Sequence, residues 1–446
     1  MAATSEAGRG GVAWALRWWA VVFFVAVCAV VTVVQPYDNG PPIRSDGLGY
    51  HAWTRAILDG RLTFCDYPEL KRVDAATSVQ PSTGRCADKY PPGLALLRFP
   101  VMWPFTALNG GELRSGAEDA VNQLLSIVAG ALALVGVVAA ARRAGVRDWV
   151  ANCAAIAVAF GTGLFHYSTY DSSFTHAYSA AFVAGLVAFG VFRLLAAGDE
   201  PHDSTRRLVR DAVVVFVLAG FLVGIRLPSF LILAVLWLAA VFVVWRRGPR
   251  FRPRLVAITA GAAAATVVVG VSQVAYNRYV LGRWTISSYA GEHFSLERFH
   301  QLDVLASFQK GFVTWYPVVV VILLVAAWAR NWAGIGLLVG LSVPLVMLYG
   351  AWDAWGLAGG FGHRGFVELA PVFGVVFAVS LERLGANARL VSLVVAGVAV
   401  TMTMGLLVGY WAGDIAFYGA TNDQWVRYSV GASSFPIAVA HWIAGW

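Results

Sequence analysis

Charged residues are scarce in this chain of 446 residues: 13% are Asp, Glu, Lys or Arg, whereas 59% are hydrophobic. The mean hydropathy of +0.66 lies far above the range of soluble domains. No internal repeat or low-complexity segment is present. These values exclude a soluble globular protein and indicate a chain that lives in a lipid bilayer.

Apolar runs long enough to cross a bilayer, roughly 17 to 25 residues, recur along the whole chain. The first run is followed by no cleavage site for a signal peptide before Pro36, so we interpret it as an anchor. The sequence therefore predicts an all-α, polytopic membrane protein with about 11 transmembrane helices. The runs lie near residues 14–35, 118–141, 149–166, 177–197, 211–226, 229–245, 255–280, 315–329, 332–351, 366–384 and 390–411.

Arginines predict the orientation, because loops that stay inside carry the excess of positive charge. Basic residues precede the first run and follow every even-numbered run, so we expect the N-terminus inside and the C-terminus outside. The plasma (inner) membrane is the expected location, with the active site on the outer, periplasmic side. The net charge of +8 follows from this pattern and from contact with anionic membrane lipids, and gives no support for a nucleic-acid partner. These arginines are Arg9, Arg17, Arg142, Arg143, Arg147, Arg206, Arg207, Arg210, Arg246, Arg247, Arg250, Arg252, Arg254, Arg330, Arg383 and Arg389.

Lysine is almost absent, with 3 residues against 30 arginines, and all three fall in predicted outer loops, against the topological preference. They are Lys71, Lys89 and Lys310. Cysteine is also rare: two of the four lie within apolar runs, and Cys65 and Cys86 lie in the first outer segment. That second pair either forms a disulfide, worth roughly 3 kcal/mol for a loop of about 20 residues, or stays as two thiols.

Three polar segments are long enough to hold a functional site: 36–117, 281–314 and the tail from 412. We expect residues 1–411 to form one transmembrane domain, with 36–117 as its catalytic loop and 281–314 as a second outer loop. Residues 412–446 are expected to form a tail on the outer face. Function is expected where these segments meet the spans, because a bilayer tolerates irregular backbone only beside a cavity.

Two short helices on the membrane surface are predicted from near-helical apolar spacing in these segments. The first contains Tyr50, Trp53, Ile57 and Leu62, with Ser45 or Asp46 at its N-cap. The second lies in SLERFHQLDVLASF, with Ser295 as its cap. Its apolar positions are Leu296, Phe299, Leu302, Leu305 and Phe308.

Asp46, in the stretch IRSDGLGYHAW, has two interpretations. It caps the helix that follows, which is the common fate of an Asp at a helix start. Alternatively it is a general base, which takes the proton of an acceptor hydroxyl as that oxygen attacks a sugar carbon.

Cations on the same face suit a reaction whose leaving group is an anionic phosphate. Lys89 stands in CADKYPPG, Arg226 in the tight turn IRLPS, and Arg364 in AWGLAGGFGHRGF. Their alternatives are solvation of Lys89, contact of Arg226 with ordinary lipid headgroups, and an ion pair between Arg364 and Glu368. The glycines around Arg364 allow close approach of backbone to a ligand. They are Gly356, Gly359, Gly360, Gly362 and Gly365.

Further candidates for substrate contacts are Tyr50, Tyr289, Glu292 and His363. Tyr289, Trp315, Tyr316, Trp352 and Trp355 can stack on a sugar, or belong to the aromatic belt that membrane proteins carry at both interfaces. His166, Asp171 and His176 surround one outer turn, but their spacing matches no known metal-ligand pattern. We therefore expect no cofactor; a divalent metal stays possible from the residue types, but the spacing does not support one.

The order of these motifs resembles the GT-C superfamily. It runs from an Asp after the first helix, through KYPPG, the arginine–proline turn and the block YNRYVLGRW to LASFQKGFVTWYP, and ends at GFGHRGFVELAP. The nearest branch is that of lipid-carrier-dependent glycosyltransferases akin to protein O-mannosyltransferases and lipid A aminoarabinose transferases. Many relatives carry a second acid directly after the first, where this chain has Gly47.

The resemblance implies an enzyme that moves a sugar from a polyprenyl phosphate to a lipid, glycan or protein acceptor at the outer membrane face, with inversion. It implies Asp46 as the base, Lys89 and Arg226 near the carrier phosphate, and the GHR element near donor or acceptor. A purely structural membrane scaffold is one alternative, against which the polar outer loops count only weakly, and two rival functions also remain open from the sequence. One is a polysaccharide polymerase or ligase, and the other is a non-enzymatic lipid or sugar transporter, although the broken-helix repeats typical of transporters are not evident.

Overall fold

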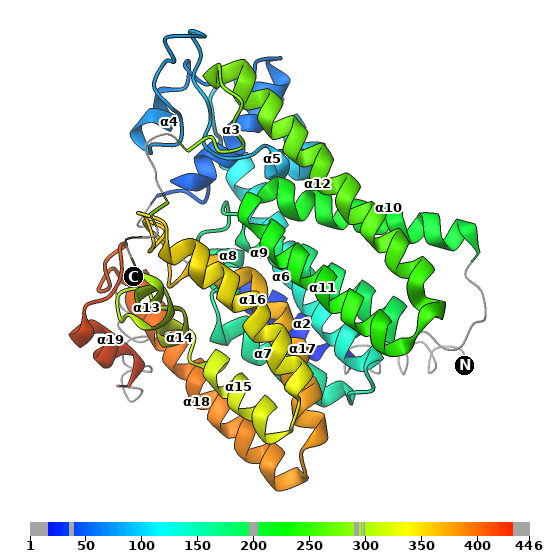
Figure 1. Ribbon diagram of the computed structural model, residues 1–446. Coiled ribbons are helices and arrows are strands. Elements are labelled where there is room, and N and C mark those ends of the chain that lie inside the picture. Colours follow the sequence, from blue (N-terminus) through cyan, green and yellow to red (C-terminus); the bar gives the residue numbers. More distant parts are fainter. Residues whose placement is uncertain are drawn as a thin grey trace, which may run out of the picture.

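Helices account for the regular structure of this protein, as the sequence predicts (Figure 1). The computed structural model describes residues 17–34, 40–195, 204–289 and 294–430, apart from 296 and 298. Within those ranges there are no strands, only isolated bridges such as the one between Phe294 and Trp352. The predicted all-α class is confirmed.

Eight helical segments among the described residues are long and apolar enough to cross a membrane. Four further apolar helices are shorter: α2 (Trp19–Val34), α5 (Gly93–Leu108), α7 (Asp148–Gly161) and α15 (Val318–Trp328). Each of the eleven predicted runs is helical over most of its length, whereas the number of actual spans stays a prediction. The long segments are built from α6 (Gly116–Arg143), α9 (His176–Gly190) with η1 (Val191–Leu195), α10 (Thr205–Ile225), η2 (Leu227–Ser229) with α11 (Phe230–Arg247), η3 (Pro249–Phe251) with α12 (Arg252–Leu281), α16 (Trp332–Gly350), η4 (Arg364–Leu369) with α17 (Ala370–Arg383), and α18 (Ala386–Trp411).

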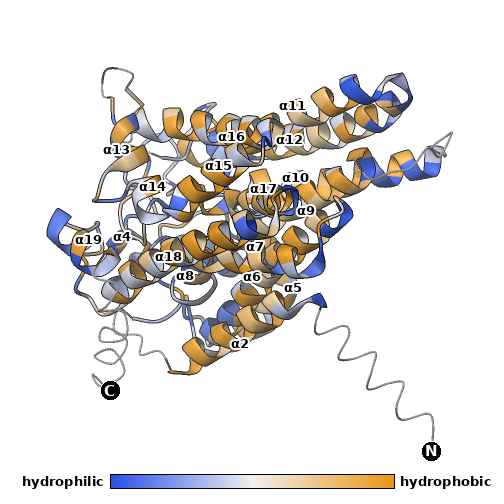
Figure 2. Cartoon of the chain, turned by 90° about the horizontal axis from the view of Figure 1, so that it is seen from below, coloured by the Kyte–Doolittle hydropathy of each residue, from blue (hydrophilic) through white to orange (hydrophobic). Residues whose placement is uncertain are grey.

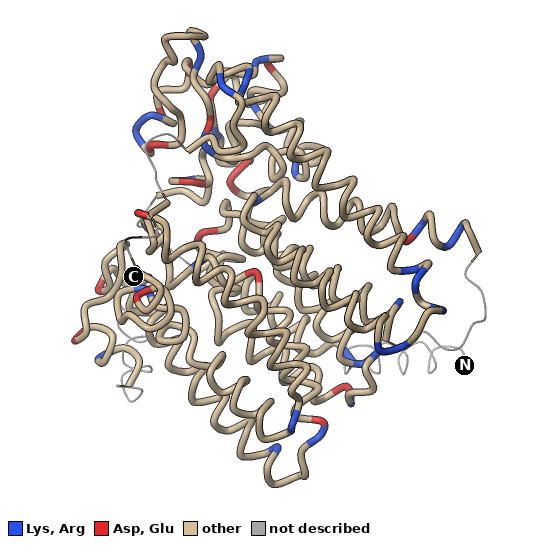
Figure 3. The backbone as a smooth tube through the Cα atoms, in the orientation of Figure 1, with Lys and Arg blue, Asp and Glu red and all other residues tan. Residues whose placement is uncertain are grey.

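The helices pack as a bundle, with α6 along α9, α10 along α12, and α17 against α7. Apolar residues cover the lengths of the helices, and hydrophilic residues gather at their ends (Figure 2). Figure 3 shows Lys and Arg at the ends of α10, α11 and α12 that point away from α3 (Asp46–Leu58) and α4 (Pro68–Arg72). These basic ends and the helices α3 and α4 therefore lie at opposite ends of the bundle, while the orientation of the chain in a membrane stays a prediction.

Helix α5 is the element that the sequence reading missed, because it lies inside the predicted outer loop 36–117 and carries Pro100 and Pro104. It packs against α3, α6 and α10. Its Arg98 is 2% exposed and donates to the Asn122 side chain on α6. The outer segment is thus partly folded into the bundle.

Both predicted surface helices need correction. The first is α3, which begins where expected, with Ser45 at the N-cap position, but it ends at Leu58, before Leu62. It buries Tyr50, Trp53 and Ala56 against its neighbours, and its position at the membrane surface stays a prediction. The Ser45 side chain makes no capping hydrogen bond.

The second surface helix is only α13 (Gln301–Ala306), and Ser295 does not cap it. The physical reason is that Phe294, Ser295 and His300 are bound to the chain at the end of α16. The Ser295 N–H donates to the Ala351 carbonyl at 2.7 Å, and Phe294 bridges Trp352. The remaining short helices are α8 (Leu164–Thr169), α14 (Phe312–Trp315) and α19 (Asn422–Ser429).

Candidate active site

A cavity of about 510 Å³ lies where α3, α9, α10, α12, α16 and η4 meet. Most of its lining is apolar, with Val223 from α10, Val269 from α12 and Leu348 from α16 as examples. Besides three tyrosines, the described part of the wall contains one carboxylate, one imidazole and two guanidinium groups, from Asp46, His176, Arg226 and Arg364. The size is that of an ordinary small-molecule site, which typically measures about 300 to 1,000 Å³.

Asp46 and Arg364 form an ion pair in this wall. The distance from the Arg364 NH2 nitrogen to Asp46 Oδ2 is 2.6 Å, and the two side chains are 12% and 18% exposed. Asp46 opens α3, where the positive end of the helix dipole favours a carboxylate. Its other oxygen, Oδ1, has the Ser45 hydroxyl at 3.5 Å. One carboxylate oxygen is thus fixed by Arg364, and the other is left with a weak neighbour.

Gly47 leaves no room for a side chain beside Asp46. A Cβ added at Gly47 would lie 1.8 Å from Ser173 Oγ and 2.4 Å from Ser173 Cβ. Ser173 is itself fully buried, in the turn before α9. The second acid that many GT-C relatives carry here has no space in this chain unless Ser173 moves or changes.

Arg226 lies at the end of α10, in the arginine–proline turn. It donates to Glu368 Oε1 at 3.1 Å and to the Tyr349 hydroxyl at 2.8 Å. The Ser229 hydroxyl donates to the other oxygen of Glu368 at 3.1 Å. The suggested Arg364–Glu368 pair is therefore wrong: Glu368 holds Arg226, and Arg364 holds Asp46. The prediction assumed the spacing of an α-helix, in which residues four apart lie on one face. Arg364 and Glu368 instead belong to η4, a tighter 3₁₀ helix, and contact different neighbours.

Lys89 lies outside the lining of the cavity, although the next residue, Tyr90, is part of it. The Lys89 ammonium forms an ion pair with Asp74, whose carboxylate is 84% exposed. The Lys89 N–H donates to the Ala75 carbonyl at 2.8 Å. Its predicted contact with the carrier phosphate requires the Lys89 side chain to leave Asp74, and it stays a prediction.

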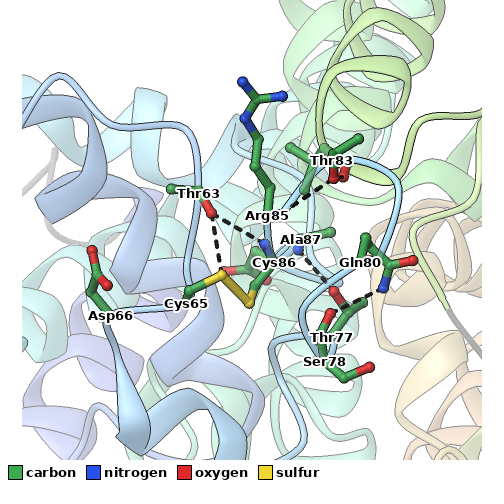
Figure 4. Close-up of a disulfide and its surroundings, with 12 residues drawn as sticks. Thr63, Cys65, Asp66, Thr77, Ser78, Gln80, Thr83, Arg85, Cys86 and Ala87 are labelled. Carbon is green, nitrogen blue, oxygen red and sulfur yellow. Dashed lines mark hydrogen bonds between the residues drawn. A yellow bond between two sulfur atoms is a disulfide. The ribbon is translucent and has the colours of Figure 1, made fainter.

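A loop directly before Lys89 is closed by a disulfide between Cys65 and Cys86, with a Cα–Cα distance of 5.0 Å (Figure 4). Of the two alternatives left open by the sequence, the structure has the bridge. The loop is also fastened to the end of α12, where the Asp88 N–H donates to the Tyr276 hydroxyl at 3.1 Å. Burial raises the pKa of Asp88 well above its usual range. These contacts fix the segment that leads into Tyr90.

Aromatic rings cover one wall of the cavity. Tyr50 and Tyr90 have ring centroids 4.5 Å apart, Tyr289 is 6.2 Å from Tyr90, and Trp352 is 5.7 Å from Tyr289. All four line the cavity, so two predicted substrate residues, Tyr50 and Tyr289, lie beside Asp46. Burial raises the pKa of Tyr50. Glu292, the other candidate in this part of the chain, lies outside the described residues.

His363 is fully buried behind the wall and is absent from the lining. Its ring nitrogen Nε2 donates to the Trp355 carbonyl at 3.0 Å, and burial lowers its pKa to about 3. The neighbouring glycines serve packing: a Cβ at Gly359 would lie 1.4 Å from the Phe417 ring, and one at Gly365 would lie 2.4 Å from the Tyr349 ring. Close approach at these two glycines is to the chain's own rings.

His166 and Asp171 are joined to each other and not to His176. The Nε2 of His166 lies 2.8 Å from Asp171 Oδ2, Arg44 donates to Asp171 Oδ1 at 2.8 Å, and the Trp411 N–H donates to His166 Nδ1 at 2.9 Å. The described part of the chain contains no group of three or more His, Cys, Asp or Glu side chains that is placed to hold a metal ion.

Three residues near the site were not assigned to the phosphate or sugar by sequence reasoning: His176, Tyr90 and Lys310. Lys310 is 1% exposed and donates to the Ala358 carbonyl, so it fastens the segment before Arg364. Burial and then the charge of Arg364 lower the pKa of Lys310 to about 7. The presence of Lys310 in a predicted outer loop, where positive charge is disfavoured, is a feature of the sequence that points to this lysine. No feature of the sequence distinguishes His176 from a histidine of the core.

No family model and no curated protein matches this chain. Among solved structures, ArnT from Cupriavidus metallidurans bound to undecaprenyl phosphate is similar, with 16% identity and a TM-score of 0.48 over 95% of this chain and 77% of that one. The oligosaccharyltransferase of Archaeoglobus fulgidus has 14% identity and a TM-score of 0.47, over 96% of this chain and 54% of that one. A structure of AglB from the same organism with an inhibitory peptide and a dolichol-phosphate has 11% identity and a TM-score of 0.43, over 97% of this chain and 56% of that one.

These three likenesses have TM-scores of 0.48 or less and identities of 16% or less. They identify no superfamily, substrate or reaction for this chain.

Proposed function

We propose that this protein is a glycosyltransferase that takes a sugar from a polyprenyl-phosphate donor. One observation carries the proposal: the carboxylate of Asp46 and the guanidinium groups of Arg226 and Arg364 line one mostly apolar cavity. An amphipathic ligand with an anionic head and a hydrocarbon tail suits such a lining. The lipid phosphates in the ArnT and AglB structures belong to this class, but TM-scores below 0.5 give that likeness no weight of its own.

The chemistry follows from the contacts of the two arginines. The acceptor hydroxyl oxygen attacks the anomeric carbon, the bond from that carbon to the phosphate oxygen breaks, and its electron pair leaves with the phosphate. The proton of the hydroxyl passes to Asp46 Oδ1, because Oδ2 is held by Arg364 at 2.6 Å. A single displacement of this kind inverts the anomeric centre.

Arg226 stabilises the charge that develops on the leaving phosphate, and its own position is fixed by Glu368 and Tyr349. The aromatic wall of Tyr50, Tyr90, Tyr289 and Trp352 offers the sugar a stacking surface. Lys89 is proposed to reach the phosphate after leaving Asp74. The acceptor is a lipid, glycan or protein at the outer, periplasmic face of the plasma membrane.

The deciding experiment incubates the purified protein with a panel of decaprenyl-phosphate sugars and native membrane lipids, and measures release of free decaprenyl phosphate. Release by the wild type, and its loss in Asp46→Asn, is the expected result. If no donor is consumed by the wild type, the transferase proposal fails and transport of the same lipids becomes the function to test.

A further inference from the structure

Residues 351–363, which we call the strap, join α16 to η4. The strap and the residue after it form one side of the candidate cavity, because Trp352, Leu357 and Arg364 all line it. Arg364 opens η4 directly after the strap, and its guanidinium lies 2.6 Å from Asp46 Oδ2. The conformation of the strap therefore bears on where the partner of the proposed base lies.

Two successive residues of the strap have a left-handed backbone. The φ angles of Leu357 and Ala358 are 55° and 54°. Such angles are uncommon for residues other than glycine, because the Cβ atom approaches the following carbonyl oxygen. Five described residues other than glycine have a positive φ, and only these two are adjacent. A turn of this kind persists only where the surrounding structure holds it.

Lys310, in the loop before α14, holds this turn. It is 1% exposed, and its ammonium donates to the Ala358 carbonyl. The stem of the lysine lies against the strap as well, because a Cβ added at Gly356 would lie 3.7 Å from Lys310 Cδ. A hydrogen bond from a charged donor is stronger than one between neutral groups. The lysine is thus placed where it opposes the strain of the turn.

The left-handed turn lies next to the side chain of Arg364. Gly360 comes two residues after Ala358, and a Cβ added at Gly360 would lie 3.5 Å from Arg364 Cδ. The Gly360 N–H also donates to the Phe417 carbonyl at 3.2 Å. The stem of Arg364 therefore packs on the part of the strap that follows the turn.

We propose that Lys310 is a positioning residue for transfer, which keeps the strap in the conformation that supports Arg364. This inference rests on the proposed function. Lys310 does not line the cavity, so it acts through the strap and not by touching the substrate. Arg364 in turn holds Oδ2 of Asp46 and leaves Oδ1 to take the proton. Loss of the lysine should misplace the base and lower the rate of transfer. Donor binding should change little, because the proposed phosphate contact comes from Arg226 at the end of α10.

Two substitutions separate this role from simple packing. Lys310→Met removes the donor and keeps most of the side-chain volume. We expect it to lower kcat about tenfold, the loss that follows when one hydrogen bond from a charged group is removed, with the KM for the donor within about twofold. Ala358→Gly removes the backbone strain at an exposed residue, because glycine adopts a positive φ without cost. Added to Lys310→Met, it should raise kcat again by about two- to fivefold.

Amide hydrogen exchange of residues 354–360 follows the strap without turnover. Exchange should be faster in Lys310→Met than in the wild type, and slower again when Ala358→Gly is added. Lys71→Met is the matched control, because Lys71 is an exposed lysine on α4 that does not line the cavity. It should change neither kcat nor the exchange of the strap. If Lys310→Met does not fold, Lys310→Leu takes its place.

The outcomes distinguish this inference from the function on which it rests. A folded Lys310→Met protein with the kcat of the wild type would overturn the positioning role, while loss of transfer in Asp46→Asn would still support the proposed function. A lowered kcat that Ala358→Gly does not raise would also overturn it, because the lysine would then not act by opposing the strain of the turn. If the wild type transfers no sugar, the proposed function fails and the positioning role fails with it.

Discussion

Replacing Asp46 by Asn tests the proposed base with little change of shape. In the wild type, Arg364 lies 2.6 Å from Asp46 Oδ2. The Asn variant keeps an oxygen that can accept a hydrogen bond from Arg364, but its amide cannot take up a proton. General-base catalysis contributes about 10²- to 10⁴-fold in rate, or about 3 to 5 kcal/mol of barrier. We expect kcat for transfer to fall by that factor and the KM for the donor to change little.

The stability of the variant should fall far less than its rate. The ion pair is only partly buried, since its side chains are 12% and 18% exposed, so its loss should cost about 1 to 3 kcal/mol in the free energy of unfolding. Thermal unfolding in detergent separates this effect from catalysis, because the protein must remain folded at the assay temperature.

Asp59→Asn is the matched control for this measurement. Asp59 ends the same helix and pairs with Arg55 at 3.1 Å, but it does not line the cavity. The transfer rate of Asp59→Asn should stay within about twofold of wild type. An exposed ion pair contributes only about 0 to 1 kcal/mol to the free energy of unfolding. A folded Asp46→Asn protein that transfers sugar at the wild-type rate would refute the role of Asp46 as base.

Three further outcomes follow from the structure. Gly47→Ala should lower the free energy of unfolding by about 1 to 3 kcal/mol, because the added methyl group clashes with Ser173. The double variant Gly47→Ala, Ser173→Gly should recover part of this loss, measured by thermal unfolding. An unchanged stability of Gly47→Ala would contradict the close contact between these residues. Replacing Cys65 and Cys86 by Ser should lower the free energy of unfolding by roughly 3 kcal/mol, which is the loop-entropy value for this spacing. The loss should appear as a lower Tm, and an unchanged Tm would argue against the disulfide. Burial lowers the pKa of Lys310 from 10.5 to about 7. Between pH 7 and pH 10.5 the unfolded chain therefore binds more protons than the folded one. The free energy of unfolding of the wild type should then rise with pH, by up to about 1.4 kcal/mol per pH unit relative to Lys310→Met. Parallel pH curves for the two proteins would show that Lys310 does not titrate in this range.

The membrane helices could be predicted from the sequence because burial in lipid needs a long apolar run, and each run is visible by itself. Helix α5 could not, since its two prolines and its position in a polar segment hide a helix whose stability comes from packing on α3 and α6. The late start of α13 also escaped prediction, because Ser295 and His300 make hydrogen bonds to the end of α16.

Part of the lining of the candidate cavity could be predicted from the sequence, whereas the roles of its residues stay predictions. Asp46, Arg226 and Arg364 do line one cavity, with Tyr50 and Tyr289, while Lys89 and His363 lie outside its lining. Which charges pair could not be read from the sequence, since the partner of Arg364 is far away along the chain and the nearer Glu368 serves Arg226. Such choices are made by tertiary packing, for which spacing along one helix gives no information.

The ion pair between Asp46 and Arg364 also bears on how the protein is made. Asp46 is synthesised early and Arg364 late, after α16. Helix α16 itself supplies part of the cavity wall. Until η4 has been inserted, the carboxylate has no guanidinium beside it and the wall is incomplete. A half-synthesised chain thus lacks the pocket in which we propose that the lipid carrier binds, and the pocket is completed only late in membrane insertion.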